Sequence, residues 1–97
     1  MQIITDNSVN KFISKLNEIE KGRILRYLDL LDKYGFTLSG KYLKKLTSEV
    51  WELRPGNIRL LFGKSKINQN VFIVNVFKKK MQKTPKKEIE TAITRLK

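Results

Sequence analysis

The chain has 97 residues, of which 40% are hydrophobic, and 21 Lys and Arg residues against 9 Asp and Glu residues give it a net charge of +12. This length predicts a single domain over residues 1–97, because domains cluster around 100–150 residues. The sequence contains no Cys and no His, which excludes disulfide scaffolds, thiolate zinc sites, cysteine nucleophiles and histidine acid–base catalysis.

Two amphipathic helices are expected near the start of the chain. Hydrophobic residues recur at helical spacing over residues 9–19 and again over residues 24–31. Gly22 is expected to break the pattern between them, and Gly35 suits the left-handed position that ends the second helix. Two adjacent helices with a short break predict an antiparallel helical hairpin. A short first strand over residues 2–5 is an additional option.

The hydrophobic period changes to two in the second half of the chain. Residues 50–54 and 58–62 alternate between apolar and polar side chains, and the Pro-Gly-Asn sequence between them is typical of a turn, so a β-hairpin is expected. Residues 71–77 are apolar at most positions, as a central strand would be. Thr84 and Pro85 then predict the cap and the first residue of a last helix.

These elements predict an α+β domain in which two N-terminal helices and a C-terminal helix pack on one face of an antiparallel sheet of three to four strands. If the hairpin has a two-residue loop, Glu52 faces Arg59 across it. Its apolar side chains share one face, which the helices can cover: Trp51, Leu53, Ile58, Leu60 and Phe62.

The opposite face of the hairpin is predicted to be uncovered, and it carries Glu52, Arg54 and Arg59. Arginine binds phosphate through two parallel hydrogen bonds, so two arginines on one face favour a phosphate site. The alternative is a solvated ion pair between Glu52 and Arg59. Further lysines are expected nearby, from the loop before the hairpin and from the end of the last strand: Lys44, Lys45, Lys78, Lys79 and Lys80.

The positive charge is concentrated in the second half of the chain. Residues 1–40 contain six basic residues against five acidic ones, whereas residues 41–97 contain 15 against four, a net charge of +11. Such a surface attracts polyphosphates, so a nucleic acid or a ribonucleoprotein is the expected partner, with a merely solubilising surface as the alternative. No apolar run approaches the ~18 residues of a membrane helix, and residues 1–6 do not have the pattern of a signal peptide. We therefore expect a cytoplasmic protein with no membrane partner.

Two segments resemble a known family. Val50-Trp-Glu-Leu-Arg54 and the basic stretch over residues 76–93 resemble the HigB-like, phage-derived branch of the RelE/ParE toxin superfamily, and the resemblance extends over residues 9–97. It implies a RelE-like, microbial-RNase-like fold and a toxin of a type II toxin–antitoxin pair. Relatives cleave mRNA on the translating ribosome. A cognate antitoxin, often a helix-turn-helix protein, neutralises them, and operator DNA is contacted only through the antitoxin.

The resemblance also assigns candidate residues. Arg54 and Arg59 match the strand arginines of the family, and Lys78 and Lys79 match its basic pair after the last strand, so these four are the expected catalytic residues. Glu52 is a candidate base or orienting group. Further lysines are expected to bind RNA or the ribosome: Lys44, Lys45, Lys80, Lys83 and Lys86.

The implied reaction is attack of a ribose 2′-hydroxyl on its own phosphate, with the arginines and Lys79 neutralising the developing charge and with no metal or cofactor. A lysine of lowered pKa among like charges is the preferred base, because Arg59 would keep Glu52 weakly basic. The family's His or C-terminal Tyr is missing, since the chain has no His and no Tyr after Tyr42. The general acid and base are therefore left open.

Two other functions stay open. A ParE-like toxin would act on gyrase, and its expression would damage DNA while mRNA stays intact. A basic RNA- or ribosome-binding protein without catalysis would be harmless on overexpression. A gene for a small helix-turn-helix protein beside this one would favour the toxin.

Overall fold

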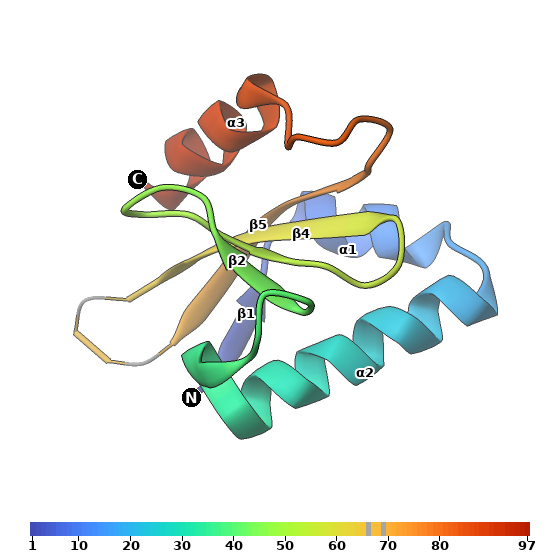
Figure 1. Ribbon diagram of the computed structural model, residues 1–97, viewed down its shortest axis with the longest axis horizontal. Helices are drawn as coiled ribbons and strands as arrows, with labels where there is room; N and C mark the ends of the chain where they lie inside the picture. Colours follow the sequence, from blue (N-terminus) through green and yellow to red (C-terminus); the bar gives the residue numbers. More distant parts are fainter. Residues whose placement is uncertain (66, 69) are drawn as a thin grey trace.

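The computed structural model describes residues 1–65, 67–68 and 70–97, which form three helices and a five-stranded sheet (Figure 1). The α+β class predicted from the sequence is confirmed. In chain order the elements are β1 (Ile3–Thr5), α1 (Asn7–Ser14), α2 (Glu18–Tyr34), a short 3-10 helix (Gly35–Thr37), β2 (Leu43–Lys45), β3 (Trp51–Leu53), β4 (Ile58–Lys64), β5 (Val71–Lys78) and α3 (Lys86–Leu96).

The sheet is mixed, which the sequence did not predict. Its strand order is β1-β5-β4-β3-β2, and β1 runs parallel to β5 whereas the other neighbours are antiparallel. The expected hairpin forms its centre with β5, which is an internal strand as predicted. The strand that was not predicted is β2, which lies at the edge of the sheet in a segment expected to be a loop. Three residues are too few to show an alternating pattern, so the sequence could not reveal it.

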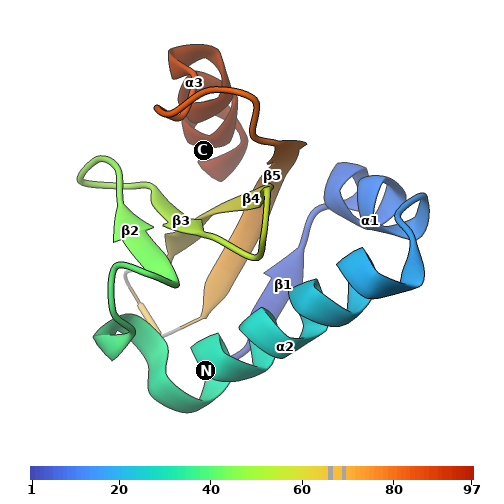
Figure 2. The same cartoon turned by 45° about the vertical axis from the view of Figure 1, so that its right-hand side comes forward.

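The helices cover both faces of the sheet, so the expectation of helices on one face is wrong. α1 and α2 lie on one side and α3 on the other (Figures 1 and 2). The α1/α2 side holds the larger hydrophobic cluster, and all five residues of the predicted apolar face belong to it or pack against it. α3 covers a smaller second cluster, formed by Val50, Leu61, Val74, Phe77 and Ala92.

The break between the two N-terminal helices lies before Gly22, which is inside α2. The side chain of Asn17 accepts a hydrogen bond from the backbone N–H of Glu20 at 2.8 Å, and the Glu20 carboxylate accepts one from the N–H of Asn17 at 3.3 Å. This reciprocal capping starts a new helix, and it outweighs the weak helix propensity of a single glycine. Gly35 ends α2 with a φ of +58°, as predicted.

The turn between β3 and β4 is longer than two residues. Glu52 pairs with Leu61, and Leu53 pairs with Leu60, so the predicted pairing of Glu52 with Arg59 is wrong by two positions. A shift of two keeps every side chain on its predicted face, because side chains alternate with a period of two. Glu52 and Arg59 therefore still share a face.

A bulge in β5 connects the sheet to α3. Leu61 pairs with Asn75 and Phe62 pairs with Ile73, which leaves Val74 as the extra residue. The buried Asn75 amide donates to the backbone carbonyl of Glu88 in α3 at 3.0 Å. The hydrogen bond satisfies a buried polar group and holds the helix against the strand.

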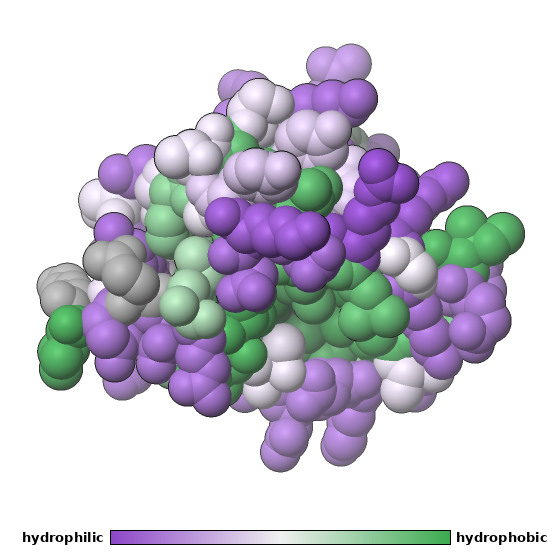
Figure 3. Space-filling model, turned by 90° about the horizontal axis from the view of Figure 1, so that it is seen from below, coloured by the Kyte–Doolittle hydropathy of each residue, from purple (hydrophilic) through white to green (hydrophobic). Residues whose placement is uncertain are grey.

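The other side of the molecule leaves apolar surface exposed. Ile19 and Leu25 on α2 are about 70% and 67% exposed. Figure 3, which views the molecule from the α2 side, shows an apolar area bordered by hydrophilic residues. None of the helices in the described ranges is long and apolar enough to cross a membrane.

Candidate active site

A groove of about 220 Å³ lies on the α3 side of the sheet, where β2 and β3 face the loop that leads into α3. Many of the candidate residues from the sequence meet there. Its lining consists of Lys44, Lys45, Leu46, Glu52, Arg54, Lys79, Gln82, Lys83, Thr84 and Ile89. One acidic residue among five basic ones gives the groove a strongly positive charge.

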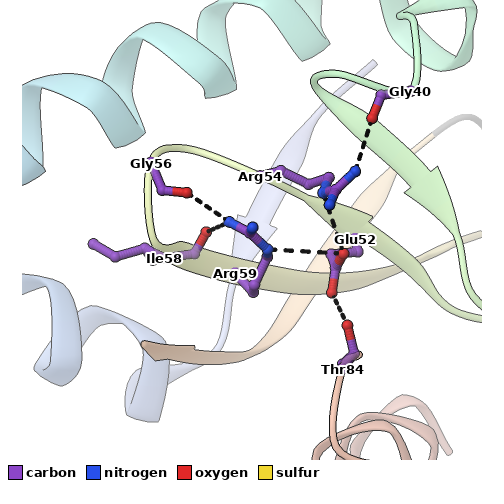
Figure 4. A network of polar contacts seen from close by, with 7 residues as sticks. All are labelled: Gly40, Glu52, Arg54, Gly56, Ile58, Arg59 and Thr84. Atoms are coloured by element: carbon purple, nitrogen blue, oxygen red, sulfur yellow. Dashed lines mark hydrogen bonds and ion pairs between the residues drawn. The ribbon is translucent and has the colours of Figure 1, made fainter. Parts of the chain in front are cut away.

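Glu52 is the centre of the polar network in this groove, and it is only 1% exposed (Figure 4). One carboxylate oxygen faces two guanidinium groups, with Nε of Arg54 at 3.5 Å and Nε of Arg59 at 3.9 Å. The other oxygen accepts a hydrogen bond from the Thr84 hydroxyl. A buried carboxylate is tolerated only with such partners, so Glu52 holds both arginines and the loop before α3 in place.

Arg59 is buried, with 8% of its surface exposed, so its predicted position on an uncovered face is wrong. The side chain folds back onto the β3–β4 turn, where Nη1 donates to the carbonyl of Gly56 at 2.7 Å and to that of Ile58 at 2.9 Å (Figure 4). Burial lowers the pKa of this guanidinium, and the charge of Glu52 opposes the shift. Arg59 is consequently a fixed charge beneath the groove, and its hydrogen bonds also stabilise the β3–β4 turn.

Arg54 is the more accessible of the two arginines. Its side chain is 28% exposed, and Nη1 donates to the carbonyl of Gly40 at 3.0 Å. Neither Nε, of Arg54 or of Arg59, has a hydrogen-bond partner within the part of the chain that the structure describes. Charge attraction to Glu52 therefore holds these two atoms in place.

Lys79 lies in the groove, at the end of β5. Its backbone N–H donates to the carbonyl of Asn57 at 2.7 Å, which ties the start of the basic loop to the β3–β4 turn. Burial lowers the pKa of the Lys79 ammonium, and the charge of Arg59 lowers it further, whereas Glu52 raises it. A lysine held among like charges in this way can lose its proton more readily than a surface lysine.

Lys78 lies apart from the groove. Its ammonium pairs with the Glu20 carboxylate at 3.3 Å, and Glu20 belongs to α2 on the opposite face of the sheet. Lys78 is the last residue of β5 and Lys79 follows it, and the two side chains diverge: Lys78 pairs with α2, whereas Lys79 lines the groove. The sequence had grouped these two lysines. Lys80 and Lys86 are exposed and do not line the groove, whereas Lys83 does.

Lys44 and Lys45 line the groove as expected, although they belong to β2 and not to a loop. Thr84 is the residue that the sequence misplaced. α3 begins at Lys86, one residue later than predicted, so Pro85 takes the cap position without a side-chain hydrogen bond, and the Thr84 hydroxyl is bonded to Glu52 instead. One sign was present in the sequence: Lys87 stands three residues after Thr84, where a capping box has Glu or Gln.

The groove can bind and polarise an anion. Across residues 1–65, 67–68 and 70–97 no three acidic side chains gather into a possible metal site. The groups available to a ligand are the Arg54 guanidinium and the ammonium groups of the groove lysines. Fixed cations around one pre-organised carboxylate suit a phosphodiester, and they would stabilise charge that builds up on it.

Comparisons with known proteins identify the family and the fold of the chain. Residues 11–97 match the family described as phage-derived protein Gp49-like. The fold is that of RelE. A chain of the archaeal RelE–RelB complex from Pyrococcus horikoshii OT3 superposes with a TM-score of 0.70 at 19% identity, over 81% of this chain and 94% of that one. The isolated E. coli RelE toxin superposes with a TM-score of 0.58 at 16% identity, over 99% and 98%. No curated protein sequence matches.

Proposed function

The chain belongs to the Gp49-like family of phage-derived proteins, and from that premise we propose that it is the toxin of a type II toxin–antitoxin pair that cleaves mRNA on the ribosome. The RelE fold supports the proposal. The observation that carries it is the buried Glu52 carboxylate, which holds Arg54 and Arg59 beside Lys79 in a groove lined by cations.

The proposed reaction uses the mRNA's own ribose as nucleophile. The ribosome would hold the strand so that a 2′-hydroxyl lies in line with its phosphate. Lys79 would take the hydroxyl proton as the oxygen attacks, since burial and Arg59 lower its pKa and so favour its neutral form relative to a surface lysine. Arg54 would bind the phosphate oxygens as negative charge builds up on them. The bond between phosphorus and the 5′-oxygen breaks as the new bond forms, and the leaving oxygen takes a proton from water. The products are a 2′,3′-cyclic phosphate and a 5′-hydroxyl.

In this proposal Glu52 orients the arginines and does not act as the base. Its carboxylate is 1% exposed, and its two oxygens already face Arg54, Arg59 and Thr84. A general base must come within hydrogen-bond reach of the proton that it removes, and a ribose cannot reach an oxygen enclosed in this way. The exposed groove lysines Lys44, Lys45 and Lys83 would bind the flanking phosphates.

The proposed partner is a cognate antitoxin. One structural relative was solved as a RelE–RelB complex. Residues 41–97 carry a net charge of +11, so an acidic segment over this half would compete with RNA for the same surface. We expect that binding of the antitoxin weakens the affinity of the protein for ribosomes.

The test is expression in bacteria, followed by primer extension on cellular mRNA. The wild-type protein should arrest growth and leave cuts at ribosome-occupied positions. Arg54→Ala should remove both effects, and Arg54→Lys should restore them only in part, because a point charge cannot reproduce the guanidinium fork. Lys15→Ala, on the near-neutral half, is the control and should behave as wild type.

Two results would contradict the proposal. Growth arrest with DNA damage and intact mRNA would indicate a gyrase-directed toxin. Harmless overexpression of a folded protein that binds ribosomes would indicate a basic binding protein without catalysis. Purified protein should leave free RNA nearly intact, since the chain has no His to orient and deprotonate a 2′-hydroxyl without the ribosome.

A further inference from the structure

A group of aromatic and basic side chains lies at the β2 edge of the sheet, outside the polar network of Glu52. The rings of Phe36 and Trp51 contact each other with centroids 4.8 Å apart. The Lys45 ammonium lies 5.4 Å from the centre of the Trp51 ring, and the Lys64 ammonium lies 5.0 Å from the centre of the Phe36 ring. We call these four residues the Trp51 cluster.

A hollow of about 510 Å³ adjoins this cluster, and it is larger than the groove at Glu52. Such a volume falls within the ~300–1,000 Å³ typical of ligand pockets. Lys45, Trp51 and Lys64 contribute to its lining together with Phe72 and the hydroxyl residues Ser48 and Ser65. It thus combines aromatic surface, positive charge and hydrogen-bonding groups, with Glu49 as its acidic member.

The hollow and the groove meet at β2. Lys45 lines both of them, and its neighbour Lys44 lines the groove. β2 is an edge strand, and both lysines on it are exposed. A polyanion that leaves the groove across this edge would pass directly from one lysine to the other. Lysines on an edge strand also prevent pairing with other chains, but that role does not explain the aromatic surface beside them.

We propose that the Trp51 cluster is a second contact for single-stranded RNA, at which a base flanking the cleaved phosphate stacks on the Trp51 ring. The inference rests on the proposed function. Bases of any sequence stack on exposed aromatic rings beside a basic groove. In the free protein the Lys45 ammonium lies over the half-buried Trp51 ring. On binding it moves to a phosphate, and the base takes its place.

Trp51 is the sole tryptophan of the chain, so its fluorescence reports on this position alone. The experiment titrates the purified protein with a short 2′-O-methyl oligoribonucleotide, which cannot be cleaved, and with an abasic strand of the same length. We expect saturable quenching by the oligoribonucleotide. The abasic strand should bind through its phosphates, as measured by the anisotropy of an end label, and leave the fluorescence nearly unchanged.

Two charge variants matched in number test the lysines. Lys45→Ala combined with Lys64→Ala should weaken binding about tenfold, because it removes two phosphate contacts beside the ring. Lys11→Ala combined with Lys15→Ala removes the same charge from α1 and the residue that follows it, and should weaken binding only slightly. Trp51→Phe should retain most of the affinity, whereas Trp51→Leu should lose about tenfold, since an aliphatic side chain offers no stacking surface. A thermal melt confirms that each variant is folded.

Some results would overturn the inference. Unchanged fluorescence while labelled RNA binds would show that the strand does not reach Trp51, and equal quenching by the abasic strand would show that no base stacks there. Ribosome-dependent cleavage is scored separately. Normal cleavage with unchanged fluorescence contradicts the second contact alone, whereas quenching without cleavage supports the contact and contradicts the proposed function.

Discussion

The two faces of the sheet differ in what they bury. The face under α1 and α2 encloses a hydrophobic cluster that includes Phe62, Leu60 and Ile24, with no charged residue among its buried members. The face under α3 buries a smaller hydrophobic cluster together with Glu52, Arg59 and Asn75. Burying polar groups is unfavourable unless each is hydrogen-bonded or paired. The α3 face therefore contributes less to the free energy of unfolding than the α1/α2 face. The candidate active site lies on this α3 face, where the need for stability does not account for the buried charges.

The largest effect is expected on the apolar face. Phe62→Ala should reduce the free energy of unfolding by about 3–5 kcal/mol, because Phe62 is fully buried and its removal leaves a cavity. A denaturant titration measures the loss, and Leu25→Ala on the exposed side of α2 is the control. Cleavage per folded molecule should be unchanged. A loss of cleavage without a loss of stability would mean that the α1/α2 face contributes to catalysis and not only to stability.

The next effect is expected in the groove. Lys79→Ala should slow mRNA cleavage by ~10²–10³, the usual result of removing one group that acts in the transition state, and leave the melting temperature nearly unchanged. Lys78→Ala is the matched comparison, because this neighbouring lysine pairs with Glu20 on the other face. It should reduce cleavage far less. Equal losses in the two variants would show that the separation of these lysines has no functional meaning.

Arg59 contributes both to the candidate site and to the stability of the fold. Arg59→Ala should destabilise the protein by about 1–3 kcal/mol, since it removes the donor to the carbonyls of Gly56 and Ile58 and one of the two guanidinium groups beside the Glu52 carboxylate. An uncovered Arg59, as predicted from the sequence, could be removed without loss of stability. A denaturant titration that matches the wild type would indicate that Arg59 lies on an uncovered face. The control is Arg54→Ala, which should lose less stability because Arg54 is more exposed.

The smallest effect is on the titration of Lys79. Glu52 favours its charged form, so Glu52→Gln should lower the pKa of Lys79 further and move its titration to lower pH. Arg59→Lys keeps a positive charge nearby and should move it much less. NMR of the lysine side chains across alkaline pH measures both, with the Lys79 signal identified by its loss in Lys79→Arg. A shift to higher pH in Glu52→Gln would contradict the arrangement of charges described above.

The sequence predicted the fold class and most of the elements correctly, because those depend on local patterns. The alternation over residues 50–62 identified the hairpin and its apolar face, and an error of two positions in register left that face unchanged. The motifs around Trp51 and Lys79 identified the family, which the match over residues 11–97 confirms. The role of each candidate site residue stays a prediction that the experiments above address.

By itself the sequence determined the helices, the central strands, the concentration of positive charge in residues 41–97 and the set of candidate side chains. The tertiary structure decided which of them meet. It placed α3 over the face predicted to be open, buried Arg59 against the β3–β4 turn, turned Lys78 toward α2 and used Thr84 to hold Glu52. These outcomes depend on contacts between residues far apart in the chain. Periodicity and propensity report only on near neighbours, so they contain no information about such contacts.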